Sequence, residues 1–392
     1  MSTILFASEL RAGIGHVRSL AALARELSSR GHSAVFALGN LAEAWPLLRP
    51  DAFPLFQAPI QLNLPGKPIV DPASRSLAHI LGAAGWSQTD FLEPVVRAWD
   101  GLLDRLKPSL VVTDAAPALC LAARGTVPVA QTGAGLFMPP PDQAEFPLLQ
   151  EAPSGAATPD ELLDSVSEVQ RRRGRPAPVR LPAIFDAGPQ FLTTFVPFDP
   201  YSSLRDRIHL GPVDSVPPPL PPPDRPCWFA YLDADNAGII PTLEALVAVG
   251  MPGEAFLRSL TRVQREDFAD FGIRLLEAPA PPSELLARAS FVVHHGGSGL
   301  GCAALAAGRP QLLVPRGLEQ ALSAANLAAA GVGLIAGEGK EAGDVLHRLA
   351  GSKAAAEAAQ SEASRIRDAG PWEARDQVIE ACLALLNSGE NP

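Results

Sequence analysis

The chain has 392 residues, which is enough for two domains that each bury a core. Hydrophobic residues make up 47% of it and charged residues 19%, the balance of a soluble globular protein, and no apolar run is long enough to span a bilayer. The net charge of -10 argues against nucleic acid as a partner and leaves at most peripheral contact with a membrane.

The cysteines and the N-terminus indicate the cellular compartment. Cys120, Cys227, Cys302 and Cys382 are scattered without the spacing of metal ligands, which predicts buried thiols instead of disulfides or zinc ligands. The N-terminus lacks the charged segment and following apolar stretch of a secretion signal. We therefore expect a cytoplasmic protein.

The first half of the chain alternates short apolar runs with helical spacing, which predicts parallel strands joined by helices. Strands are predicted over 3–7, 33–38, 108–113, 127–131, 191–195 and 208–210, and helices over 17–29, 92–106, 117–124 and 161–169. Residues 46–72 are rich in proline, which predicts loops. Residues 137–183, rich in proline and charge, predict an insertion that either covers a binding site or is a solvated excursion without a role.

A run of prolines, VPPPLPPPDRP over residues 216–226, predicts a stiff linker between two domains. Residues 1–215 are then the N-terminal domain and residues 227–370 the C-terminal one. In the second domain the pattern predicts strands over 227–232, 273–277, 291–293 and 311–314, and helices over 242–249 and 284–289. Beyond Gly333 it predicts helices only, over 352–368 and 372–386.

The stretch after the predicted strand 291–293 is the strongest candidate for a binding site. Its sequence, HHGGSG over residues 294–299, opens into an Ala- and Leu-rich segment with helical spacing. A glycine-rich turn between a strand and a helix presents unpaired backbone N–H groups at the positive end of the helix dipole, and a histidine beside it can add a donor. The turn therefore predicts a diphosphate site.

Glu319 and Gln320 open the next predicted helix, after the strand over 311–314. Glu319 alone would be an ordinary acid at a helix start. Loops that follow neighbouring strands of a doubly wound sheet line one crevice, however, so we expect both residues near the same ligand. Their polar groups are suited to sugar hydroxyls.

HHGGSG, followed by ALAAGRPQLLVPRGLEQ and AANLAAAGVG, resembles the donor-binding signature of the UDP-glycosyltransferase superfamily and of its bacterial macrolide-glycosyltransferase-like branch. The resemblance implies a GT-B fold, an α/β architecture of two Rossmann-like domains with parallel sheets facing across a cleft. It assigns residues 1–215 to the acceptor side, with 137–183 over the cleft, and residues 227–370 to the nucleotide-sugar donor. Residues 371–392 would form a helix that packs back on the N-terminal domain.

The resemblance also implies roles for single residues. The donor diphosphate would be held by His295, Gly296, Gly297, Ser298 and Gly299, and the donor sugar by Glu319 and Gln320. The sequence departs from the family where Tyr231 to Asn236 replace a Gly-Ser pair, and where Pro281 and Pro282 stand in the nucleotide loop. The identity of the nucleotide base is therefore not indicated.

The loop ELRAGIGHVRSL near the N-terminus admits three interpretations. As a nicotinamide-binding fingerprint it offers Gly13 and Gly15, but Arg18 replaces the third glycine. As the acceptor-side loop of a glycosyltransferase it is similar to the G-H-V and R-G-H pattern of the superfamily. As a plain turn between strand and helix it needs its glycines only for conformation.

Two residues are candidates for catalysis on the strength of the resemblance. Inverting glycosyl transfer needs a base that deprotonates the acceptor hydroxyl. Many relatives carry a catalytic histidine where this chain has Ile14, and others use a histidine or an acid at the position of His16, which makes His16 the candidate base. Asp114 matches the aspartate that orients and charges such a histidine. The alternatives are a structural role for His16 and a helix N-cap at Asp114.

The resulting prediction is a metal-independent, inverting glycosyltransferase that moves a hexose or deoxyhexose from a UDP- or dTDP-linked sugar to a hydroxyl of a small molecule or lipid. No cofactor or metal is expected, because no carboxylate pair stands where a cation would bridge phosphates. The chain would act as a monomer or homodimer. The alternatives are an epimerase or hydrolase of the same fold, and a nucleotide-sugar-binding protein without catalysis.

Overall fold

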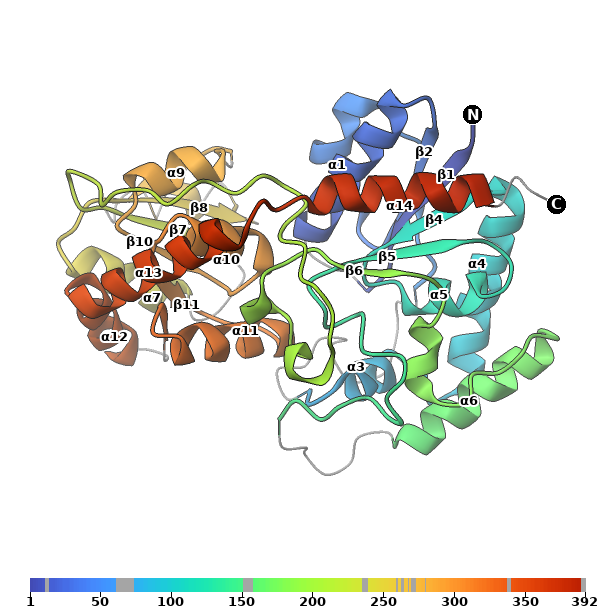
Figure 1. The fold of residues 1–392 in the computed structure, drawn as a ribbon. Helices are drawn as coiled ribbons and strands as arrows, with labels where there is room; N and C mark the ends of the chain where they lie inside the picture. The colour runs from blue at the N-terminus through green and yellow to red at the C-terminus, as the bar shows by residue number, and fades with distance from the viewer. Residues whose placement is uncertain are drawn as a thin grey trace. The chain divides into compact units, whose positions relative to one another are not determined.

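The computed structural model describes residues 1–10, 14–60, 74–150, 158–234, 239–258, 260–261, 264–266, 268, 273–278, 280–336 and 340–388. The chain divides into two compact units. The first unit comprises Met1–Asp214 together with Trp372–Pro392, and the second comprises Ser215–Pro371. Each unit is a parallel sheet with helices on its faces (Figure 1).

The first unit contains a six-stranded parallel sheet in the order β3-β2-β1-β4-β5-β6. Its strands are β1 (Thr3–Ser8), β2 (Ser33–Leu38), β3 (Leu55–Gln57), β4 (Leu110–Thr113), β5 (Val129–Gly133) and β6 (Gln190–Leu192). The central strands are continuous apolar runs because helices cover both faces of a parallel sheet. The strand order reverses between β1 and β4, and in such sheets ligands bind beyond the carboxyl ends at this reversal.

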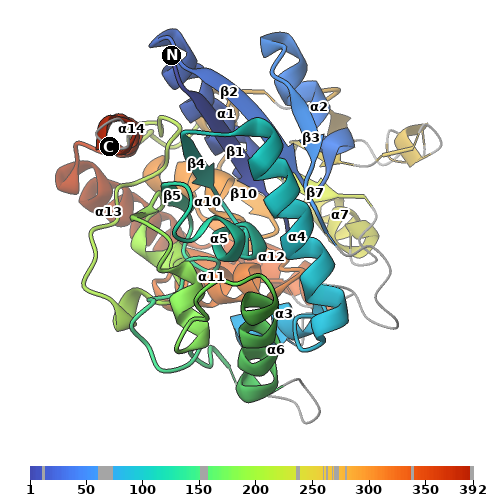
Figure 2. The ribbon, with the colours of Figure 1, turned by 90° about the vertical axis from the view of Figure 1, so that its right-hand side faces the viewer.

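Seven α-helices in the described part of this unit surround its sheet. They are α1 (Ile14–Ser29), α2 (Leu41–Leu48), α3 (Leu77–Ala83), α4 (Thr89–Leu106), α5 (Pro117–Ala123), α6 (Pro159–Arg172) and α14 (Ala374–Ser388). Helix α14, from the C-terminal end of the chain, shares one apolar core with α1 and β1 through side chains such as Val378, Cys382 and Leu20. Helix α4 packs against α5 and α6, and the three helices are seen together in Figure 2.

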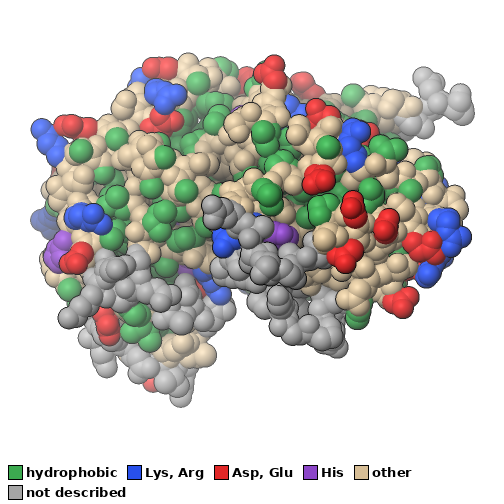
Figure 3. Space-filling view, turned by 90° about the horizontal axis from the view of Figure 1, so that it is seen from below, with side chains coloured by type: hydrophobic (Ala, Val, Ile, Leu, Met, Phe, Trp, Pro, Cys, Tyr) green, Lys and Arg blue, Asp and Glu red, His purple; other side chains and the backbone are tan. Residues whose placement is uncertain are grey.

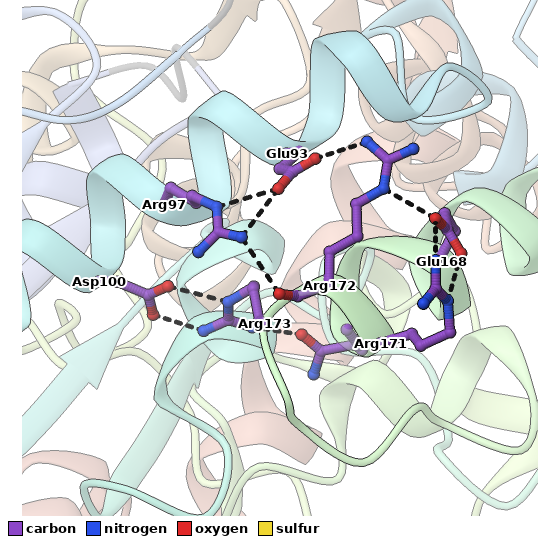
Figure 4. A network of polar contacts seen from close by, with 8 residues as sticks. Glu93, Arg97, Asp100, Glu168, Arg171, Arg172 and Arg173 are labelled. Carbon is purple, nitrogen blue, oxygen red and sulfur yellow. Dashed lines mark hydrogen bonds and ion pairs between the residues drawn. The ribbon is translucent and has the colours of Figure 1, made fainter.

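The basic run Arg171–Arg173 at the end of α6 is engaged in a network with α4 (Figure 4). Arg172 reaches Glu93 at 2.8 Å, and Arg173, whose side chain is 2% exposed, pairs with Asp100. Glu168 binds Arg171 and Arg172, each at 2.7 Å, and these partners lower the pKa of its carboxyl to about 2. The charges of the predicted insertion 137–183 therefore fasten α6 to α4.

The second unit contains another six-stranded parallel sheet, in the order β12-β11-β10-β7-β8-β9. Its strands are β7 (Trp228–Asp233), β8 (Gly253–Arg258), β9 (Arg274–Leu275), β10 (Phe291–His294), β11 (Gln311–Leu313) and β12 (Gly333–Ile335). Its described helices include α7 (Ile239–Ala248), α9 (Pro282–Arg288), α10 (Ser298–Ala306), α11 (Leu318–Ala329), α12 (Lys340–Ala350) and α13 (Lys353–Ala369). The central strand β10 lies between β7 and β11, so the turn that follows it is flanked by the ends of both neighbours.

The proline-rich segment 216–226 is fastened to this unit. The guanidinium of Arg309, 2% exposed, donates to the carbonyl oxygens of Leu220 at 3.2 Å and Pro221 at 2.6 Å. The backbone N–H of Leu220 donates to the carbonyl of Ala307. The same guanidinium reaches Leu286 O at 2.8 Å, so one arginine joins the proline-rich segment to α9.

Several local predictions differ from the structure. Residues 208–210 were predicted as a strand, but only a single bridge joins His209 to Leu192, and Ile208 is 83% exposed, so its apolar side chain contributes nothing to a core. The prediction of helices alone beyond Gly333 is wrong, because Gly333–Ile335 form β12. Strand β8 was missed because Gly253, Glu254 and Arg258 interrupt its apolar pattern.

In the described parts of the chain, the helices all fall short of the length or apolarity needed to cross a membrane. On the face drawn in Figure 3, acidic and basic side chains lie scattered among apolar ones. On this face, charges of both signs are therefore mixed.

Candidate active site

In the first unit, His16 and Asp114 form a close pair. His16 lies in the first turn of α1, and Asp114 directly follows β4. The distance from His16 Nδ1 to Asp114 Oδ2 is 2.8 Å, and the two side chains are 18% and 6% exposed. A carboxylate bound to Nδ1 fixes the proton on that nitrogen, which leaves Nε2 as the basic nitrogen of the ring. The structure thus brings the two predicted catalytic residues together.

Backbone geometry holds Asp114 in place. Its N–H donates to the carbonyl of Ala7, and the next residue, Ala115, has a φ of 56° that turns the chain sharply after β4. Gly133, at the end of β5, has a φ of 143°, and a Cβ there would lie 2.6 Å from Asp114 Oδ1. The carboxylate therefore occupies space that only a glycine leaves open. Of the two predicted loop glycines, Gly15 lies in the first turn of α1, and Gly13 lies outside the described residues.

Glu9 is a buried acid at the same end of the sheet, which the sequence alone gave no reason to select. Its carboxylate accepts hydrogen bonds from the Trp99 indole at 2.7 Å and from the backbone N–H groups of Ala118 and Leu119 in α5. Burial raises the pKa of this carboxyl to about 8, against the opposing effect of the three donors. The backbone N–H of Glu9 donates to Ala115 O, so Glu9 also fixes the turn that follows Asp114.

A small hollow with a cavity volume of about 30 Å³, partly open to solvent, is lined in part by Glu9. Its wall is mostly apolar and includes Leu10, Ile60, Trp86, Phe91 and Val95. An apolar hollow with one acid at its edge is the kind of surface that binds small organic molecules.

In the second unit, the glycine-rich turn after β10 begins with two histidines whose rings are fixed by hydrogen bonds. His294 is 1% exposed; its Nδ1 accepts from the backbone N–H of Gly296 at 3.1 Å, so Nε2 carries the proton and donates to Gln311 Oε1 at 2.8 Å. Burial lowers the pKa of this ring to about 4. His294 is therefore neutral and faces the neighbouring strand β11.

The ring of His295 is also engaged on both nitrogens. Nδ1 lies 2.8 Å from the carbonyl oxygen of Val314, to which it donates, and Nε2 accepts from the backbone N–H of Asp233 at 2.9 Å. Burial is the main cause that lowers the pKa of this ring as well. The neutral ring of His295 thus joins the ends of β7, β10 and β11.

The glycines of the turn differ in backbone conformation and in the space around them. Gly296 has a φ of 91°, and a Cβ there would lie 2.9 Å from the carbonyl oxygen of Gln320. At Gly297 and Gly299, by contrast, an added Cβ would meet nothing within 4 Å. Gly297 is the N-cap of α10 and Ser298 its first residue, so the open side of the turn lies at the positive end of that helix. This arrangement suits an anion.

Glu319 and Gln320 lie in the first turn of α11, both half-buried. Gln320 Oε1 accepts from the backbone N–H of Arg316 at 2.8 Å, and the carbonyl oxygen of Gln320 faces Gly296. The structure therefore brings Gln320 to the glycine-rich turn.

Asp233, Arg258 and Arg316 form a cluster beside the turn that the sequence analysis did not select. Oδ2 of Asp233, at the end of β7, binds Nη1 of Arg316 at 2.8 Å and also pairs with Nη2 of Arg258, the last residue of β8. The signal in the sequence was a charged residue at the end of β7 and at the end of β8, and the second could be recognised only once β8 was placed. Among the described residues, no group of three His, Cys, Asp or Glu side chains is arranged to hold a metal ion.

The chain is similar to known proteins in its C-terminal part and over most of its length. Residues 257–381 match the family described as erythromycin biosynthesis protein CIII-like, C-terminal domain. The chain is 26% identical to the L-demethylnoviosyl transferase of Streptomyces niveus over 339 residues, which cover 82% of each protein.

Solved structures resemble the whole chain. The calicheamicin glycosyltransferase CalG4 is similar with a TM-score of 0.67 at 20% identity, over 100% of both chains. The glycosyltransferase VinC in complex with dTDP is similar with a TM-score of 0.62 at 16% identity, over 100% of both chains. SnogD from Streptomyces nogalater is similar with a TM-score of 0.57 at 20% identity, over 98% of this chain and 99% of that one. Together with the two parallel sheets, these matches show that the chain has the GT-B fold, which it shares with these glycosyltransferases.

Proposed function

We propose that the protein transfers a hexose or deoxyhexose from a UDP- or dTDP-linked sugar to a hydroxyl group of a small-molecule or lipid acceptor, with inversion and without a metal. The observation that carries this proposal is the 2.8 Å contact between His16 Nδ1 and Asp114 Oδ2. A histidine held in this way is a general base whose conjugate acid is stabilised by the carboxylate. The dTDP in the VinC complex supports a dTDP-linked donor.

In the proposed reaction, Nε2 of His16 takes the proton of the acceptor hydroxyl while its oxygen attacks the anomeric carbon of the donor sugar. The bond from that carbon to the diphosphate breaks, and the nucleoside diphosphate leaves with the electron pair. A single displacement from the opposite face inverts the configuration. Asp114 offsets the charge that develops on His16.

The turn 295–299 would receive the leaving group. Backbone N–H groups at the start of α10 and the positive end of its dipole offset the charge that builds on the diphosphate. His295 shapes this turn, since both of its ring nitrogens bind the backbone. Glu319 and Gln320, at the start of α11, would bind the hydroxyls of the donor sugar.

The apolar pocket beside Glu9 is the candidate acceptor site. Its wall of aliphatic and aromatic side chains favours an acceptor with a large apolar surface.

The test starts with donor binding. The melting temperature is measured with UDP-, dTDP- and GDP-linked sugars, because a ligand at a hundred times its Kd adds about 2.7 kcal/mol to the free energy of unfolding. His295→Ala should abolish the shift, and His347→Ala, at an exposed position in α12, should retain it. If no nucleotide sugar shifts the melting of the folded protein, the proposed donor is wrong.

Turnover is then measured with the donor that binds and a panel of hydroxyl-bearing apolar acceptors. His16→Ala should lower kcat by at least about a hundredfold and leave the Kd of the donor unchanged. Asp114→Asn should lower kcat as well, with its pH profile displaced, because the charge opposite the imidazolium is lost. Release of free sugar without any acceptor would indicate a hydrolase, and donor binding without turnover would indicate a binding protein.

A further inference from the structure

We propose that Arg258 and Arg316, held in position by Asp233, bind the diphosphate of the donor as a pair of cationic side chains. This inference rests on the proposed function, because it names the residues that would recognise the charged part of the donor. The cluster includes Asp233, which lies in the stretch Tyr231 to Asn236 that replaces the Gly-Ser pair of the resembled family. The inference assigns a ligand to this cluster.

The two arginines come from separate parts of the chain and both contact one oxygen of Asp233. Arg258 is the last residue of β8, and Arg316 lies in the loop between β11 and α11. Both bind Oδ2 of Asp233, whose side chain is 8% exposed, while their own side chains are 28% and 36% exposed. Asp233 is thus a buried anchor, and the guanidinium groups keep surface that a ligand can reach.

The cluster lies against the glycine-rich turn. The backbone N–H of Asp233 donates to His295 Nε2 at 2.9 Å, and the charges of Asp233, Arg316 and Arg258 all act on the His295 ring. The backbone N–H of Arg316 donates to Gln320 Oε1 at 2.8 Å. An anion on the open side of the turn is therefore beside both guanidinium groups.

The positive charges of the cluster favour an anion at this place. Arg258 and Arg316 bring two guanidinium groups to the side of the turn, in a chain whose net charge is -10. The His295 ring adds no charge, because burial lowers its pKa, and no hydrogen-bond donor, because its proton is on the nitrogen that faces Val314 O. The cation that a diphosphate needs is supplied here by Arg258 and Arg316.

The geometry also allows each arginine to be removed singly. In Arg316→Ala, Asp233 keeps its pairing with Arg258, and in Arg258→Ala it keeps its 2.8 Å contact with Arg316. Neither variant leaves a buried carboxylate unpaired, so both are expected to fold. Arg288→Ala is the matched control: Arg288 is 49% exposed and binds Glu254 at the other end of β8, at 2.9 Å.

The experiment is calorimetric titration of the full-length protein and these three variants with UDP, dTDP, the corresponding nucleosides and inorganic pyrophosphate. We expect Arg258→Ala and Arg316→Ala each to raise the Kd of the nucleoside diphosphate that binds, and of pyrophosphate, about tenfold or more. The nucleoside should bind all proteins equally, and Arg288→Ala should behave as the wild type. Arg316→Lys should recover part of the loss, since it restores the charge without the planar fork.

The outcomes separate this inference from the proposed function. If the wild type binds UDP or dTDP and the arginine variants bind it equally well, the arginine pair is not the diphosphate site, although the donor assignment stands. An equal loss for nucleoside and diphosphate would also overturn the inference, because it would indicate a general change of structure. If pyrophosphate binds through the arginines but no nucleoside diphosphate binds, the proposed function fails and the anion site stands. If the wild type binds none of these probes, both are wrong.

Discussion

The backbone N–H of Asp233 donates a hydrogen bond to Nε2 of His295 over 2.9 Å. This contact joins the end of β7 to the turn after β10, and the other ring nitrogen of His295 joins the same turn to Val314 after β11. One imidazole therefore sets the relative position of three loops at the carboxyl edge of the sheet. Its role in the turn is geometric, and the positive charge beside the turn comes from arginine side chains.

The neutral ring of His294, next to His295, predicts that the stability of the second unit decreases in acid. Burial lowers the pKa of His294 from 6.5 to about 4. Below pH 6.5 the unfolded chain takes up a proton that the native chain does not, so the free energy of unfolding falls as the pH decreases from about 6.5 to about 4. At about 1.4 kcal/mol for each pKa unit, the loss is about 3 kcal/mol. Urea denaturation between pH 4.5 and 7 should show a flatter dependence for His294→Asn than for the wild type.

The control for this prediction is His347→Asn, at an exposed position in α12, which should keep the wild-type dependence on pH. Equal slopes for His294→Asn and the wild type would mean that another group causes the acid sensitivity.

Two adjacent glycines of the turn should respond oppositely to alanine. Gly296 has a φ of 91° and lies against Gln320 O, so Gly296→Ala should cost about 1–3 kcal/mol of stability. Gly297 has a φ of -67° and open space around it, so Gly297→Ala should leave the melting temperature almost unchanged. The methyl group added by Gly297→Ala would occupy the space in which the diphosphate is proposed to bind. We therefore expect the Kd of the donor to rise about tenfold. Unimpaired donor binding by Gly297→Ala would place the diphosphate elsewhere.

The sequence predicted the central strands well because they are short apolar runs bounded by glycine or aspartate. β2 matches its predicted bounds at Ser33–Leu38, and β4 and β10 agree within two residues. Edge strands such as β3 and β12 were missed, because three residues are too few to show a periodic pattern. The strands that end at Asp114 and at the turn 295–299 were therefore easily recognised, whereas β8, which ends at Arg258, was missed.

Some residues of the candidate site could likewise be recognised from the sequence, and others could not. His16, Asp114 and the turn 295–299 follow recognisable strands and belong to motifs, so their type and position were informative. Glu9 and Arg316 lie within the quoted segments but at positions to which the motifs assign no role, and Arg258 lies in no motif. Their importance depends on contacts with residues 90, 25 and 83 positions away, and such contacts become visible only in the folded chain.

Glu9 predicts an opposite dependence on pH in the first unit. Burial raises its pKa from 4.5 to about 8, so between these values the native chain holds a proton that the unfolded chain has lost. The free energy of unfolding should therefore decrease as the pH rises from about 4.5 to about 8, and Glu9 should add no further change above pH 8. Glu9→Gln removes this titration, so its stability relative to the wild type should improve across that range.

Urea denaturation at pH 5, 6.5 and 8 measures this difference, with Glu145→Gln, whose side chain is exposed, as the control. A difference between Glu9→Gln and the wild type that stays constant with pH would show that the three donors keep Glu9 ionised throughout.

Arg309 predicts how firmly the proline-rich segment is held to the second unit. Its buried guanidinium donates to the carbonyl oxygens of Leu286, Leu220 and Pro221, and its loss removes three hydrogen bonds from a charged donor. Arg309→Met should therefore cost about 3 kcal/mol in urea denaturation, and Arg309→Lys should recover little, because one ammonium group cannot reproduce the planar fork. Arg288→Ala, at a half-exposed ion pair, should change stability by less than about 1 kcal/mol. If Arg309→Met were as stable as Arg288→Ala, the prolines themselves would hold the segment in place, and the arginine would be dispensable.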